Sequence, residues 1–89
     1  MLRRLTTYYQ YGSDLQKRAE AETDPEAKAA LMEQSTRTFQ RTVEIGNAMT
    51  NLFSANPDAF FYLSAAQAQL GDAAASEANF KTYQELSGE

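Results

Sequence analysis

The side chains of this chain most suited to catalysis or metal binding are carboxylates, because its 89 residues include neither histidine nor cysteine. Histidine is the commonest general base, cysteine is a strong nucleophile, and both are preferred zinc ligands. The densest acidic group consists of Glu20, Glu22, Asp24 and Glu26. This group lacks the alternating aspartates, the glycine and the closing glutamate of a calcium-binding loop. We therefore interpret it as a solvated junction between helices and expect no metal.

Other catalytic patterns are also missing from the sequence. The four glycines stand far apart, so no glycine-rich loop could cradle a phosphate group. Two carboxylates in an enclosed cleft could perform acid–base chemistry, but no spacing in this sequence predicts such a pair. We expect a non-enzymatic protein without a cofactor.

The charge balance narrows the choice of partners. Twelve acidic residues oppose eight basic ones, which gives a net charge of -4. Nucleic-acid binding needs clustered lysines and arginines and is therefore not expected. No apolar run approaches the roughly 18 residues of a membrane span, and the first residues lack the hydrophobic stretch of a signal peptide. We expect a soluble, acidic, cytoplasmic protein.

The aromatic residues are the most suggestive feature of the sequence. Tyr8, Tyr9 and Tyr11 lie close together, and Phe60 directly precedes Phe61. Successive residues of a helix point about 100° apart, so the two rings of an adjacent pair cannot both face one core. We expect Tyr8 and Phe60 in the core, with Tyr9 and Phe61 side by side and partly exposed, where aromatic residues favour partner contacts. The alternative, that all these rings serve packing, stays open.

Four helices are predicted to position these residues, over 3–22, 25–53, 58–70 and 73–86. Apolar residues recur at three- and four-residue steps along each segment, which is the helical period. Val43 and Ile45 are the only strongly β-forming aliphatic residues, whereas alanine, glutamine and glutamate abound. The fold class is therefore all-α.

Turn signals separate these helices. Asp24 and Asn56 each precede a proline, which combines an N-capping side chain with a residue suited to the first helical position. Gly71 can end the third helix in a left-handed conformation, and Asp72 can cap the fourth. A bend is expected near Gly46 in the long second helix.

Short loops make successive helices antiparallel neighbours, so the chain is predicted to be one domain of two helical hairpins, 1–55 and 56–89. The residues expected to be buried in it are Phe39, Phe60, Leu63 and Phe80.

Residues 57–86 carry a recognisable pattern. Its landmarks are an aromatic at Phe60, Leu63 followed by the small Ser64, the turn Gly71-Asp72, the small Ser76 and the aromatic Phe80. This segment resembles one tetratricopeptide repeat, a helical hairpin that mediates protein–protein contacts. It departs from the family at Gln67, where an aromatic is usual, and at Tyr83, where alanine is usual. Tyr83 predicts that no further closely packed repeat covers the outer face.

The first half of the chain repeats these landmarks at a wider spacing. Tyr8, Tyr9, Tyr11, Gly12 and Leu15 precede Phe60, Phe61, Leu63, Ser64 and Gln67 by 52 positions, and Ser35 and Phe39 precede Ser76 and Phe80 by 41. The difference of 11 residues corresponds to about three helical turns shared by the two helices of the hairpin. The first hairpin therefore resembles an elongated repeat.

The resemblance implies a protein-binding function. In the family, the first helix of each repeat lines a concave groove. These groove positions carry over to Tyr9, Ser13, Gln16 and Lys17 in the first hairpin and to Phe61, Ala65, Ala68 and Gln69 in the second. The preferred hypothesis is a module that binds a peptide or helix of a partner protein. The alternatives are a structural element that forms a homodimer or caps a longer helical-repeat protein and, third, an enzyme accessory domain with a small ligand.

Overall fold

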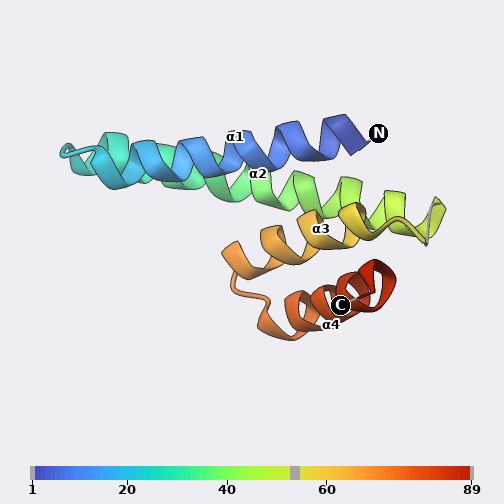
Figure 1. Cartoon of the computed structure of the whole chain (residues 1–89). Helices are drawn as coiled ribbons and strands as arrows, with labels where there is room; N and C mark the ends of the chain where they lie inside the picture. The colour runs from blue at the N-terminus through green and yellow to red at the C-terminus, as the bar shows by residue number, and fades with distance from the viewer. Residues whose placement is uncertain (1, 53–54, 89) are drawn as a thin grey trace.

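The computed structural model describes residues 2–52 and 55–88, which form four α-helices and, within those ranges, no strand (Figure 1). The helices are α1 (Leu2–Ala21), α2 (Pro25–Leu52), α3 (Pro57–Gln69) and α4 (Ala73–Ser87). The predicted all-α class is confirmed, and the described helix ends agree with the predicted ones to within one residue. The predicted end of the second helix at Phe53 lies outside the described residues.

Local hydrogen bonds explain where the helices begin. The Asn56 carboxamide oxygen accepts from the Asp58 N–H at 3.1 Å and caps α3, whose first residue is Pro57. The Asp72 carboxylate accepts from the Ala75 N–H at 3.3 Å and caps α4. Between α1 and α2, Glu22 Oε1 accepts from the N–H groups of Thr23 and Asp24 at 3.0 and 3.1 Å. The predicted caps at Asn56 and Asp72 are therefore confirmed, whereas at the α1–α2 connection the bonding side chain is Glu22 and not the predicted Asp24.

The turn between α3 and α4 is a Schellman motif. Gly71 has a φ of 83°, in the left-handed region that glycine adopts without steric cost. The Asp72 N–H donates to the Gln67 carbonyl at 3.0 Å, and the Gly71 N–H donates to the Ala68 carbonyl at 3.2 Å. These bonds satisfy the last carbonyls of α3 and turn the chain back along it.

The helices pack in chain order as two antiparallel hairpins (Figure 1). α1 lies along α2, α3 lies between α2 and α4, and α1 also contacts α3. Within the described residues α4 packs against α3 alone. The result is an elongated molecule of 44 × 23 × 17 Å, in which α1 and α2 extend well beyond the second hairpin.

The core lies where the first three helices meet. Leu5 of α1, Met49 of α2 and Ala59 of α3 form a buried cluster, and Ile45 and Tyr62 pack against it. Together these side chains tie the second hairpin to the first.

Two glycines let the helices approach closely. A Cβ atom at Gly12 would lie 3.0 Å from Cε1 of Phe39, and one at Gly46 would lie 3.1 Å from Cβ of Leu63. The chain is helical on both sides of Gly46, so this glycine serves contact with α3.

The burial predictions hold for two of the four residues. Phe39 and Leu63 are buried, Phe60 is only half-buried, and Phe80 is exposed, so the prediction for Phe80 is wrong. The physical reason is the position of α4, which has one helical neighbour and contains no buried residue. Phe39 occupies α2, which α1 and α3 both contact.

Candidate protein-binding surface

Six aromatic rings form a continuous row across the molecule. In order of contact they are Phe39, Tyr9, Tyr62, Phe61, Tyr83 and Phe80. The centroids of neighbouring rings are 5.3 to 5.7 Å apart, and the ring planes are tilted or edge-to-face. These are the favourable arrangements for aromatic pairs. This aromatic row links all four helices.

Exposure differs sharply between the two ends of the aromatic row. Phe39, at the α2 end, is 2% exposed, whereas Phe61 is 38% and Phe80 is 39% exposed. Tyr9, Tyr62 and Tyr83 are half-buried. The row therefore begins in the core and ends on the surface of the second hairpin.

The predicted pair Tyr9 and Phe61 belongs to this row, but the two rings are separated. Tyr62 lies between them, 5.6 Å from Tyr9 and 5.4 Å from Phe61. Sequence reasoning missed Tyr62, although Ala59 and Ala66 mark its face of α3 at three- and four-residue steps. Tyr8, expected in the core, is half-buried, as is Tyr9.

The other predicted groove residues occupy the faces of α1 and α3 with different exposure. On α1, Ser13 and Gln16 are half-buried and Lys17 is exposed. On α3, Ala65 is half-buried, and the exposed pair is Ala68 and Gln69. Of these side chains, Ala68 lines a hollow.

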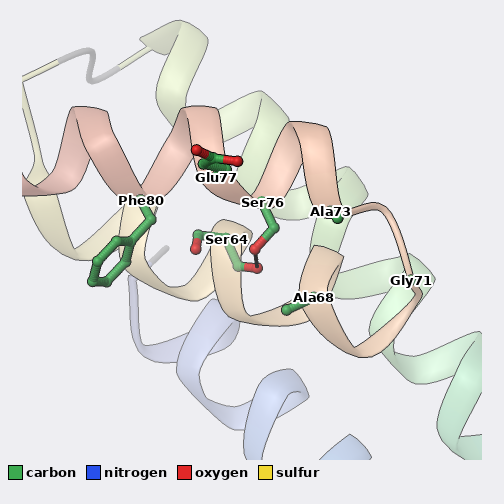
Figure 2. A pocket seen from close by; sticks show the side chains of 7 residues that line it. All are labelled: Ser64, Ala68, Gly71, Ala73, Ser76, Glu77 and Phe80. Atoms are coloured by element: carbon green, nitrogen blue, oxygen red, sulfur yellow. Dashed lines mark hydrogen bonds between the residues drawn. The ribbon is translucent and has the colours of Figure 1, made fainter.

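This hollow lies between α3 and α4 and has a volume of about 400 Å³ (Figure 2). The residues that line it are Ser64, Ala68, Gly71, Ala73, Ser76, Glu77 and Phe80. The Ser76 hydroxyl donates to the Ser64 carbonyl at 2.8 Å on its floor, and the Phe80 ring stands at one end. Small side chains thus leave a shallow depression beside an exposed aromatic ring.

A second hollow of about 400 Å³ lies in the elongated part of the first hairpin, lined by Arg18, Ala21, Glu22 and Leu31. It contains a single large apolar side chain and no aromatic ring. It therefore resembles the hollow beside Phe80 in size but not in chemistry.

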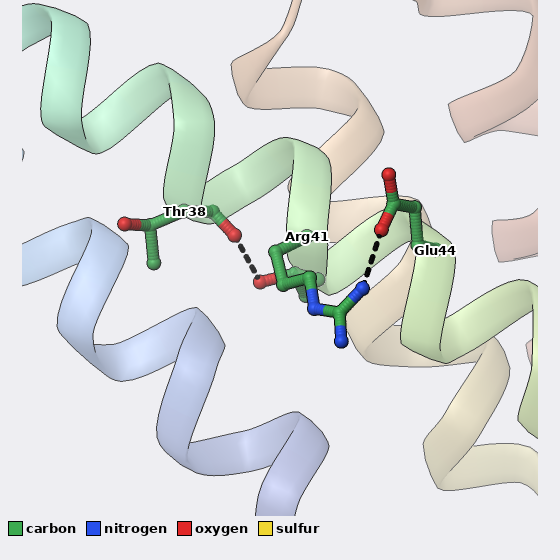
Figure 3. A network of polar contacts seen from close by, with 4 residues as sticks. Thr38, Arg41 and Glu44 are labelled. Carbon is green, nitrogen blue, oxygen red and sulfur yellow. Dashed lines mark hydrogen bonds and ion pairs between the residues drawn. The ribbon is translucent and has the colours of Figure 1, made fainter.

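An exposed ion pair lies on α2, outside the second hairpin. On α2, Arg41 donates to Glu44 at 2.8 Å, beside the hydrogen bond from Thr42 to the Thr38 carbonyl (Figure 3). The hydrogen bond and negative charge of Glu44 hold the pKa of Arg41 above its ordinary value. Both side chains of the pair are exposed, so solvent screens it.

Residues 2–52 and 55–88 contain neither a cluster of metal ligands nor a membrane-spanning helix. In these ranges no three carboxylates come close enough together to hold a metal ion. None of the four helices described there combines the length and the apolar character that a membrane span needs.

The same hydrogen bond joins the two helices of each hairpin, at positions that the sequence offsets match. The Ser35 hydroxyl of α2 donates to the Gly12 carbonyl of α1 at 2.9 Å. Ser76 of α4 makes the same bond to Ser64 of α3, with a length of 2.8 Å. Gly12 and Ser64 are 52 positions apart, and Ser35 and Ser76 are 41 positions apart. The helices of both hairpins therefore approach at equivalent places.

Comparison with protein-family models, curated proteins and solved structures found no match to this chain. The resemblance to a tetratricopeptide repeat thus stays a prediction from the residues, and the surface must be interpreted from its own chemistry.

Proposed function

We propose that this protein is a non-enzymatic interaction module that binds an apolar segment of a partner protein on the second hairpin. The observation that carries the proposal is the exposure of three large apolar side chains there: Phe61 at 38%, Phe80 at 39% and Leu86 at 39%. We refer to these three residues, with the half-buried Tyr83 that contacts both phenylalanine rings, as the α3–α4 surface.

Exposed rings have an energetic cost that a partner would remove. Burial of apolar area contributes about 25 cal/mol per Å², so folding gains nothing from the exposed part of a ring. Aromatic residues are also frequent hot spots in protein interfaces, where a few anchors supply most of the affinity. Phe61 and Phe80 are each held by Tyr83 and so present preorganised contacts.

The predicted groove is compatible with this surface. Ala68 of α3 and Phe80 of α4 both line the hollow, and Phe61 joins Phe80 through Tyr83, so a bound peptide could extend from the rings into the hollow. Tyr9 would support the Phe61 ring indirectly, because Tyr62 contacts both rings, and Tyr9 need not touch the partner.

The acidic surface supports a protein partner over nucleic acid or an anionic membrane, both of which attract basic proteins. We also propose that the protein is cytoplasmic. Self-association through this surface, or a capping role in a larger helical assembly, is the alternative that the experiment must separate.

A peptide-display selection against the immobilised protein tests the proposal. Selected peptides are expected to lose binding when Phe61→Ser and Phe80→Ser are introduced and to keep it with the control Leu52→Ser. Leu52 is more exposed than either phenylalanine but lies at the end of α2. Circular dichroism verifies that each variant is folded.

Binding that survives the two phenylalanine substitutions would refute the proposed surface. Sedimentation at several concentrations addresses the alternative: mass that rises with concentration, and falls with Phe61→Ser, would favour self-association.

A further inference from the structure

The two hairpins provide an internal comparison that indicates what the α3–α4 surface binds. α1 corresponds to α3 and α2 corresponds to α4, because equivalent serines make equivalent hydrogen bonds across each pair. In the same registration Tyr9 corresponds to Phe61, 52 positions later, and Phe39 corresponds to Phe80, 41 positions later. In each hairpin these two residues belong to the aromatic row.

In the first hairpin, α3 packs over Tyr9 and over the part of α2 that follows Phe39. Tyr62 packs on Tyr9 with its ring centroid 5.6 Å away, and the Leu63 side chain lies against Gly46. On α2, Thr42 is fully buried and Gly46 is buried. A single helix therefore covers this part of the first hairpin.

In the second hairpin, the equivalent positions have no helix over them within the described residues. Moving 41 positions along from Thr42, Ile45 and Gly46 gives Tyr83, Leu86 and Ser87 on α4. Leu86 is 39% exposed and Ser87 is exposed, whereas Ile45 is half-buried and Gly46 is buried. The exposed apolar side chains of α4 thus occupy the places that α3 covers on α2.

We propose that the α3–α4 surface docks an amphipathic α-helix of a partner protein whose contact face has the chemistry of α3. That face carries an aromatic residue followed by leucine, flanked by small residues three or four positions away, as in Ala59, Tyr62, Leu63 and Ala66. The inference rests on the proposed function and specifies its partner. It follows from the α2–α3 contact, because a helix docked on α4 would repeat the packing of α3 on α2.

The docked helix lies farther from α4 than α3 lies from α2. Tyr83 replaces Thr42 and Ser87 replaces Gly46, so both positions carry larger side chains. Helix spacing follows the size of the side chains at the contact. This departure agrees with the sequence prediction that no closely packed repeat covers Tyr83, and it makes the complex one of aromatic contacts and modest affinity.

The other end of the molecule does not offer such a helix to a second copy. The residues of α1 that correspond to Ala59, Leu63 and Ala66 are Thr7, Tyr11 and Asp14, and all three are exposed. Thr7 and Asp14 are polar, so this face of α1 lacks the small apolar residues with which α3 packs on α2. Head-to-tail stacking of α1 on the α4 of another copy would bury the Asp14 carboxylate, which is costly without a partner charge.

The test is an NMR titration of the isotopically labelled full chain with a capped peptide that copies residues 56–71. We expect saturable shifts at Phe80, Tyr83 and Leu86 with a Kd of about 1 mM or tighter. A control peptide with Asp in place of the copied Leu63 should bind about tenfold more weakly or worse, because it places a charge in the contact. On the protein, Leu86→Asp should abolish the shifts, and the matched α1 variant Tyr11→Asp should leave them unchanged.

Several outcomes would overturn this inference. One is the absence of shifts up to about 1 mM peptide. A second is shifts centred on Thr42 and Gly46, which would mean that the peptide replaces the native α3. A third is that the α4 signals move when the protein alone is diluted and that the peptide does not compete with this change. This result would assign the surface to a second copy.

The inference and the proposed function fail separately. If displayed peptides depend on Phe61 and Phe80 but lack the helical pattern of small residues and leucine, the protein-binding function stands and the helix inference is wrong.

Discussion

Phe39 and Phe80 form a matched pair for measuring how much full burial of an aromatic ring stabilises this fold. They occupy equivalent places on α2 and α4, and both are mid-helix phenylalanines. Replacing each by alanine removes the same atoms, so helix propensity and the burial of alanine itself cancel to first order in the comparison. What remains is the difference in burial and in the cavity left behind.

The magnitude follows from the exposed fractions. Phe39 is 2% exposed and Phe80 is 39% exposed, a difference of 37%. For an aromatic side chain with about 200 Å² to bury, this difference is about 75 Å², or about 2 kcal/mol at 25 cal/mol per Å². Phe39→Ala is expected to cost about 3–5 kcal/mol because it also creates a cavity, and Phe80→Ala about 1–3 kcal/mol.

Urea denaturation followed by far-UV circular dichroism measures both costs in free energy of unfolding. If Phe39→Ala does not fold, the milder pair Phe39→Leu and Phe80→Leu preserves the comparison. Equal losses in the two variants, or a larger loss at Phe80, would refute the reasoning, because Phe80 would then be as enclosed as Phe39. A larger loss would also count against an open docking face on α4.

Three further predictions concern stability and can be measured by the same urea melts. Gly12→Ala should destabilise despite its better helix propensity, because the new Cβ would lie 3.0 Å from the Phe39 ring; a stabilised variant would mean that the ring yields easily. Asn79→Ala should cost about 1–3 kcal/mol, because it removes the donor 2.7 Å from the buried Gln67 oxygen. Adding Gln67→Leu to Asn79→Ala should recover much of that loss. A double variant as unstable as Asn79→Ala alone, or less stable, would contradict a satisfied buried pair. Gly71→Ala should cost about 1–2 kcal/mol from its φ of 83° alone, since no atom lies within 4 Å of the added methyl group; an unchanged midpoint would show that the turn tolerates a side chain.

The sequence determined the number, order and ends of the helices because those features depend on neighbouring residues. Asn56 with Pro57, and Gly71 with Asp72, act through bonds that span only a few positions, and the structure has these bonds where the sequence predicts them. The serine landmarks coincide with the close approach that the structure shows within each hairpin, because a close approach requires a small residue at that position.

The tertiary structure alone decided which aromatic rings are buried. Helical periodicity fixes the angle between side chains on one helix, but not which of its faces meets another helix. Phe39 and Phe80 carry equivalent local signals, yet one ring is buried and the other exposed, because α2 packs against two helices and α4 against one. Tyr62 likewise became the centre of the aromatic row because α1 and α3 come into contact there, which no local pattern specifies.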